Sequence, residues 1–137
     1  MKEINKDVKK GSKMYGNTAH NIYAQNNVGI ESPGKLIEML YEGVLRFNAQ
    51  AKKAIKDGDL EKRAYWTNRS VAIITELMSV LDYKNGNVAG YLGGLYDYQL
   101  QLLFSANIEN STEKLDECSS VFKALLEAWR ETTNVAN

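Results

Sequence analysis

Apolar residues recur at three- and four-residue steps from residue 32 onward, and this spacing predicts amphipathic helices. The first helix begins at Ser32-Pro33, because serine caps free backbone amides and proline fits the first helical position. It ends in the break at Lys56–Asp59, where Gly58 can take a left-handed cap and Asp59 can cap the next helix. Its predicted core positions are Leu36, Leu40, Val44, Phe47, Ala51 and Ala54.

Three further helices follow, joined by short connections. The second ends near the turn at Asp82–Asn87, the third covers Asn87–Asn107, and the fourth runs from about Ser111 to Thr132. This order predicts an all-α fold, an antiparallel up-down four-helix bundle over residues 32–133 with a tail at 134–137. A flexible N-terminal segment or a short cap helix is expected before the bundle. The predicted core positions are Leu60, Ala64, Val71, Ile74, Met78 and Leu81 in the second helix and Leu115, Cys118, Phe122, Leu125, Leu126 and Trp129 in the fourth.

The third helix has more apolar surface than a core-facing helix needs. At about 100° per residue its apolar arc covers roughly 200°. Gly93 and Gly94 are predicted to lie away from the core. The pattern leaves open which flank of the arc is buried. The centre of the arc holds Val88, Leu92, Leu95, Leu103 and Ala106, one flank holds Tyr91, Tyr98 and Leu102, and the other holds Ala89, Tyr96 and Leu100.

The second helix is also apolar on two sides, since Trp66, Ile73, Leu77 and Val80 lie outside its core stripe. Any one of these residues fits ordinary packing at the edge of the bundle. The surplus as a whole favours a binding groove, because large contiguous apolar patches mark interaction sites. An amphipathic helix is the partner that suits a groove between helices.

Composition and charge narrow the class of protein. The 137 residues suggest one domain, and 17 basic residues balance 17 acidic ones, so the chain lacks the positive charge typical of nucleic-acid binding. The single cysteine, Cys118, cannot form an internal disulfide, which favours a reducing compartment. With no signal-like or membrane-spanning stretch in the sequence, we expect a cytoplasmic protein without membrane insertion.

The sequence shows no combination of residues typical of a catalytic site. The one histidine, His20, lies in the polar N-terminal segment, and no cysteine cluster or phosphate-binding loop accompanies it. The pair Glu38 and Glu42 is interpreted as a solvated helical face, and Cys118 as a small core residue. We therefore expect no enzyme, no metal and no cofactor.

Gly11-Ser12-Lys13 before Met14 looks like a junction, so residues 1–13 are interpreted as a tag or leader.

A series of short motifs resembles the FliS family of flagellin export chaperones, in order and spacing, over about residues 14–132. Each motif alone is weak, and the series is specific. The segment at 14–25 also resembles the N-terminus of this family. The motifs are "SPGKLIEMLYEGVLRF" (32–47), "LDY" (81–83), "LYDYQ" (95–99), "AN" (106–107), "KLDE" (114–117) and "LLEAWRE" (125–131).

The resemblance implies a small cytoplasmic helical bundle that binds the disordered C-terminal segment of flagellin. Binding would prevent premature polymerisation and keep flagellin competent for type III flagellar secretion. A co-chaperone and components of the flagellar export gate are further candidate partners, and the chain itself would be a monomer or weak dimer. The alternative function is a structural or adaptor bundle that uses the same surface for self-association.

The resemblance also suggests site residues. Residues 14–31 would form a cap over part of the groove, with Ile22 and Tyr23 in that role. His20 departs from the apolar or tyrosine residue common in the cap, and the turn at Asn85–Asn87 looks one residue shorter than usual. The flagellin-binding groove is predicted to be lined by Met39, Ile73, Leu77, Val80, Tyr83, Tyr91, Tyr98 and Leu102.

Overall fold

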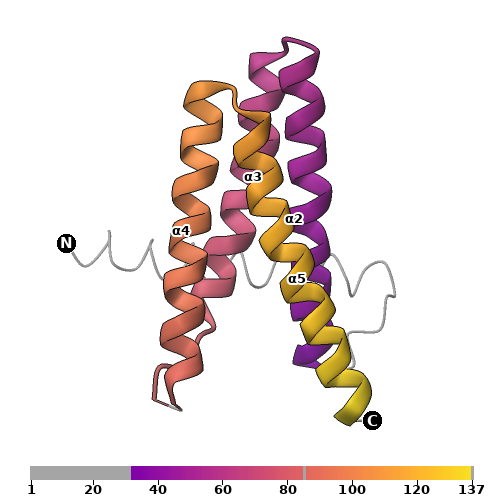
Figure 1. The fold of residues 1–137 in the computed structure, drawn as a ribbon, viewed down its shortest axis with the longest axis vertical. Coiled ribbons are helices and arrows are strands. Elements are labelled where there is room, and N and C mark those ends of the chain that lie inside the picture. Colours follow the sequence, from indigo (N-terminus) through magenta and orange to yellow (C-terminus); the bar gives the residue numbers. More distant parts are fainter. Residues whose placement is uncertain (1–31, 85, 137) are drawn as a thin grey trace, which may run out of the picture.

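A computed structural model describes residues 32–136 of the chain except residue 85, with side chains up to residue 133. Within this part lie the helices α2 (Pro33–Lys56), α3 (Leu60–Ser79), α4 (Asn87–Glu109) and α5 (Thr112–Ala136). Successive helices run in opposite directions, and α5 returns beside α2 to close a ring of four (Figure 1). The predicted all-α bundle is confirmed. The predicted leader at 1–13 and the cap residues Ile22 and Tyr23 lie outside the described residues.

The helix ends follow from local capping. The Ser32 hydroxyl oxygen accepts a hydrogen bond from the Lys35 amide (3.3 Å), and Asp59 Oδ1 accepts one from the Lys62 amide (3.0 Å). Gly58 has φ +71°, the left-handed conformation that glycine adopts without a steric penalty. The predicted break between the first two helices is therefore confirmed, with the expected residues at each end.

Apolar side chains from all four helices fill the centre of the ring. Two buried tyrosines add a polar contact, because the Tyr41 and Tyr96 hydroxyls lie 2.7 Å apart and share a hydrogen bond. The Phe122 ring packs against both phenol rings, at centroid distances of 5.8 and 6.2 Å. Burial raises the pKa of both tyrosines. The buried residues include the predicted Leu40, Val44, Ala51, Ala54, Ile74, Leu103, Ala106, Leu115, Cys118, Phe122 and Leu126.

Several predicted positions are wrong. Phe47 was expected in the core, but it packs against Trp66 and the guanidinium groups of Arg46 and Arg69. Leu60 and Val88 were expected in the core but are 54% and 68% exposed, because each lies in the first turn of its helix at an end of the bundle. Gly93 was expected away from the core but is buried, and a methyl group there would lie 2.7 Å from the Tyr83 hydroxyl oxygen. The last helix also extends to Ala136, beyond its predicted end.

The structure decides which flank of α4 is buried. Ala89 and Tyr96 lie in the core, at 7% and 2% exposure, whereas Tyr91 and Tyr98 are 72% and 50% exposed. The wide apolar arc of α4 is thus divided between the bundle interior and the surface, and the exposed tyrosines belong to the surface part.

Candidate binding surface

The exposed large apolar side chains of the described residues are confined to α3, the connection after it, and α4. Among the described residues, α2 and α5 contribute no exposed large apolar side chain. The distribution agrees with the apolar surplus predicted for these two helices. The exposed residues are Leu60, Tyr65, Val80, Tyr83, Val88, Tyr91, Tyr98, Phe104 and Ile108.

One part of the predicted site lies where α3 packs on α2. The Ile73 side chain approaches Gly43 so closely that a methyl group at residue 43 would lie 2.8 Å from Ile73 Cδ1. Met39 precedes Gly43 by one turn, and Val80 follows Ile73 by two turns, so each lies on nearly the same side of its helix. Met39 and Ile73 are half-buried, and Val80 is exposed. We call this strip of Met39, Gly43, Ile73 and Val80 the α2–α3 seam.

A second part lies on α4 next to α5. The Tyr98 hydroxyl donates to Glu117 Oε1 on α5 (3.2 Å), and Tyr91 lies two turns earlier on the same side of α4. Tyr83, in the connection before α4, places its phenol ring over Gly93. Because α2–α3 and α4–α5 are opposite sides of the ring of helices, the structure places Met39, Ile73 and Val80 on another face than Tyr91 and Tyr98 rather than in one groove.

Two predicted groove residues are part of the core. Leu77 is 1% exposed and Leu102 is 7% exposed, so neither offers a side chain to a partner in this structure. Leu77 follows Ile74 by three residues on the core-facing side of α3, and Leu102 adjoins the fully buried Leu103. The expectation that these two leucines line an open surface is therefore corrected, and the other six predicted residues remain candidates.

Two exposed apolar residues on α4 were missed in the sequence. Phe104 and Ile108 are 51% and 81% exposed and lie one turn apart. On the helical wheel they fall beside Asp97, a charged and exposed residue of α4. Arg63 of α3 donates to Asn107 Oδ1 (2.8 Å) between them, which holds this end of α4 against α3. The signal that could have identified them is the four-residue spacing of two large apolar side chains.

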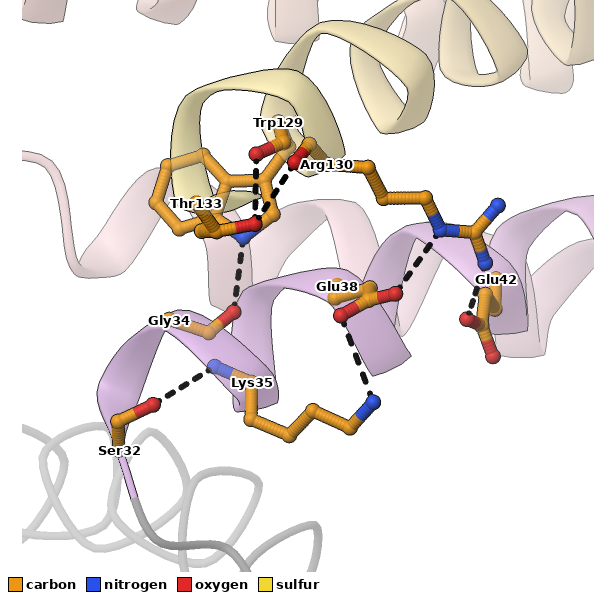
Figure 2. A network of polar contacts seen from close by, with 8 residues as sticks. All are labelled: Ser32, Gly34, Lys35, Glu38, Glu42, Trp129, Arg130 and Thr133. Carbon is orange, nitrogen blue, oxygen red and sulfur yellow. Dashed lines mark hydrogen bonds and ion pairs between the residues drawn. The ribbon is translucent and has the colours of Figure 1, made fainter. Parts of the chain in front are cut away.

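The carboxylates of Glu38 and Glu42 on α2 form ion pairs that join α2 to α5. Arg130 of α5 donates from Nε to Glu38 Oε1 (2.9 Å) and from Nη2 to Glu42 Oε1 (2.7 Å), and Trp129 Nε1 donates to the Gly34 carbonyl oxygen (2.9 Å; Figure 2). The hydrogen bond from Arg130 lowers the pKa of Glu38. Both carboxylates are thus paired with Arg130 across α2 and α5, which does not suit a general acid.

Within the described residues, the remaining reactive groups do not form a catalytic or metal-binding arrangement. Cys118 is fully buried, and burial raises the pKa of its thiol to about 11, so it is protonated near neutral pH. No cluster of His, Cys, Asp or Glu suited to a metal ion occurs among the described residues. The helices described here include none that is long and apolar enough to span a bilayer. A helical bundle with exposed apolar side chains and this surface chemistry belongs to the class of protein-binding modules.

Comparison with known proteins gives the family. The model of the family described as "Flagellar protein FliS" matches residues 15–136. The chain is 56% identical to the flagellar secretion chaperone FliS of Campylobacter jejuni over 122 residues, covering 88% of this chain and 95% of that protein. It is 35% identical to the chaperone of the same name from Bacillus subtilis, covering 80% and 81%. The corresponding protein of Salmonella typhimurium is 30% identical, covering 88% and 95%.

The chain therefore belongs to the FliS family. This is a family of chaperones and not of enzymes, which confirms the expectation that the chain is not an enzyme. The resemblance carried by the short motifs is likewise confirmed.

Proposed function

We propose that this protein is a flagellar export chaperone that binds the disordered C-terminal segment of flagellin in the cytoplasm. Binding keeps the segment from polymerising prematurely and leaves flagellin competent for type III flagellar secretion. Relatives that cover most of the chain are named flagellar secretion chaperones, which supports a secreted flagellar subunit as client.

The observation that carries the proposal is the confinement of exposed large apolar side chains to α3, the connection and α4. A disordered client loses conformational entropy when it folds on its partner, so it needs extensive apolar contact to compensate. Apolar residues on two faces suit a client that wraps around the bundle. The candidate contacts are Met39, Ile73, Val80, Tyr83, Tyr91 and Tyr98.

Isothermal titration with the C-terminal segment of flagellin from the same organism tests the proposal. We expect a one-to-one complex with a large negative heat-capacity change, because folding of the segment on the chaperone buries apolar surface. The absence of heat, together with the absence of a complex on a sizing column, would exclude flagellin as the client.

Single substitutions test the two faces separately. Val80→Asp alters the α2–α3 seam and Tyr91→Asp alters the α4 face, and both residues are exposed, so helicity should be retained. Each change should weaken the complex by roughly tenfold, the usual effect of losing an apolar interface anchor. The matched control is Ala124→Asp, which places the same carboxylate on the exposed side of α5. Equal affinity for all three variants would rule out both faces as the client site.

Self-association is the alternative use of the same surface. A second copy would cover the exposed residues of α3 and α4, and light scattering would then show a dimer that persists on dilution and in the presence of the flagellin segment. A chaperone with a free client surface should be a monomer, or a weak dimer that dissociates when the client is added.

A further inference from the structure

Two arginines and three aromatic residues gather on the outer side of α2 and α3, and we call Arg46, Phe47, Tyr65, Trp66 and Arg69 the cation–aromatic cluster. The Arg69 guanidinium lies 4.8 Å from the centroid of the Phe47 ring, 5.6 Å from that of Tyr65 and 6.0 Å from that of Trp66. The Arg46 guanidinium lies 5.2 Å from the Phe47 ring. The Trp66 ring contacts the other two rings, at centroid distances of 5.6 and 4.9 Å.

Neither guanidinium has a carboxylate partner among the described residues. Glu42, one turn before Arg46, is paired with Arg130 instead. Each guanidinium carries five N–H donors in a planar fork. Arg69 directs one of them to the Tyr65 hydroxyl (3.2 Å), and Arg46 donates no hydrogen bond within the described part of the chain. Both arginines are exposed, so the rings hold two cations whose remaining donors face solvent.

The cluster continues the α2–α3 seam. Arg69 precedes Ile73 by four residues, and Arg46 follows Gly43 by three residues, so each arginine lies about 4.5–6 Å along its helix from the Ile73–Gly43 contact. A peptide that lies along the seam therefore passes from the apolar side chains of Met39, Ile73 and Val80 directly to the two arginines.

We infer that the α2–α3 seam selects a client stretch in which apolar side chains are followed by a carboxylate, and that Arg46 and Arg69 pair with that carboxylate. The inference rests on the proposed function. An arginine fork matches a carboxylate in a two-point hydrogen bond, and stacking on aromatic rings orients the fork before the client arrives. The apolar residues then supply affinity, and the arginines supply the position and direction of the client along the seam.

The charge distribution favours a carboxylate over a nucleic-acid phosphate. The chain has no net charge, with 17 basic and 17 acidic residues, so it lacks the excess of cations that attracts a polyanion. Glu76 follows Arg69 on the same side of α3, two turns away, and would repel an extended phosphate backbone. A single client carboxylate next to the arginines meets no such repulsion.

The test is titration of the flagellin C-terminal segment into wild-type protein, Arg46→Gln and Arg46→Lys. Arg46 contacts only Phe47 of the cluster, so its loss should leave the melting temperature nearly unchanged. We expect Arg46→Gln to weaken binding by about tenfold, as for a lost charge-assisted hydrogen bond, and Arg46→Lys to weaken it less. Lys123→Gln on α5 is the control, because it removes the same charge from an exposed residue outside the ion pairs.

A second set of titrations identifies the client group. Each Asp or Glu of the segment is replaced by its amide, and one replacement should weaken binding to wild-type protein clearly more than it weakens binding to Arg46→Gln, in which only Arg69 can still pair with the carboxylate. Arg69→Gln should show the same coupling, with a lower melting temperature because Arg69 contacts three rings.

The outcomes separate the two claims. If wild-type protein binds and Arg46→Gln, Arg69→Gln and Lys123→Gln bind equally well, the arginine inference is overturned and the proposed function stands. If wild-type protein does not bind the flagellin segment, both the arginine inference and the proposed function are overturned. Displacement of the bound segment by a single-stranded RNA oligonucleotide from wild-type protein but not from Arg46→Gln would overturn the carboxylate assignment in favour of nucleic acid.

Discussion

Gln99 is a polar side chain inside an otherwise apolar part of the bundle. It is fully buried, and neither its amide nitrogen nor its amide oxygen has a hydrogen-bond partner among the described residues, as is also true of the Thr67 hydroxyl. The buried Asn48 of α2, by contrast, has hydrogen-bond partners, since it accepts from Ser70 (2.7 Å) and donates to Ser119 (3.1 Å). Burial of an unpaired amide costs free energy, so Gln99 weakens the folded state.

Gln99→Met tests this cost. Methionine fills a similar volume without polar atoms, so we expect the free energy of unfolding to rise by about 1–3 kcal/mol in urea titration. Gln101→Met is the control, because Gln101 is exposed on the same helix and should change stability by less than about 0.5 kcal/mol. A loss of stability in Gln99→Met would show that the amide is hydrogen-bonded in solution, for example to water.

At the scale of the element, α4 is the helix with the least local support. Its N-terminal cap, Gly86, offers no side chain to the free amides, and its φ of +95° would strain any other residue there. The helix also contains Gly90, Gly93 and Gly94, each of which lowers helix stability relative to alanine. Tertiary packing therefore holds α4 in place, and its exposed tyrosines and phenylalanine lie on a helix that a client can further stabilise.

The three glycines should respond differently to alanine. At Gly90 and Gly94 no atom lies within 4 Å of the added methyl group, so each substitution should stabilise the protein by about 0.5–1 kcal/mol. At Gly93 the methyl group meets the Tyr83 phenol, which must move, so the gain should be smaller or absent. Thermal unfolding of the three variants checks this order. Equal gains at all three positions would show that Tyr83 does not rest on Gly93 in solution.

At the scale of the whole molecule, contacts between α2 and α5 close the ring of helices. Arg130 bridges Glu38 and Glu42, and the Trp129 indole reaches the Gly34 carbonyl oxygen, so the start of α2 is fixed to the last turns of α5 (Figure 2). This closure lies away from the exposed apolar residues of α3 and α4. The exposed apolar residues of α3 and α4 can therefore bind a client while the contacts between α2 and α5 keep the bundle together.

The Glu38–Arg130 pair should make this closure sensitive to acid. Because the folded-state pKa of Glu38 is lowered from 4.5, its contribution to stability is fully present above pH 4.5 and is lost as pH falls through the lowered value. Glu38→Gln should therefore melt at a lower temperature than wild-type protein near neutral pH, and this difference in melting temperature should shrink as the pH falls below 4.5. Glu127→Gln, at an exposed position of α5 outside the ion pairs, should show no such gap. A gap that stays constant with pH would contradict the role of the ion pair.

The four helices and the break between the first two were determined by the sequence itself, because the forces that define them are local. Ser32-Pro33 and Asp59 cap their helices through groups three residues away, and Gly58 ends α2 by its own backbone freedom. The three- and four-residue spacing of apolar positions predicts a bundle, and the motif series predicts the family. None of these inferences depends on how one helix is rotated relative to another.

That rotation was decided only by the tertiary structure, because the apolar arcs of α3 and α4 are wider than the core can cover. Tyr96 and Tyr98 are only two residues apart, and packing against Tyr41 and Phe122 buries the first and leaves the second half exposed. Packing between neighbouring helices likewise buries Leu77 and Leu102 in the core. A helical wheel gives the angle of each side chain, whereas the neighbouring helices select which part of the arc they cover.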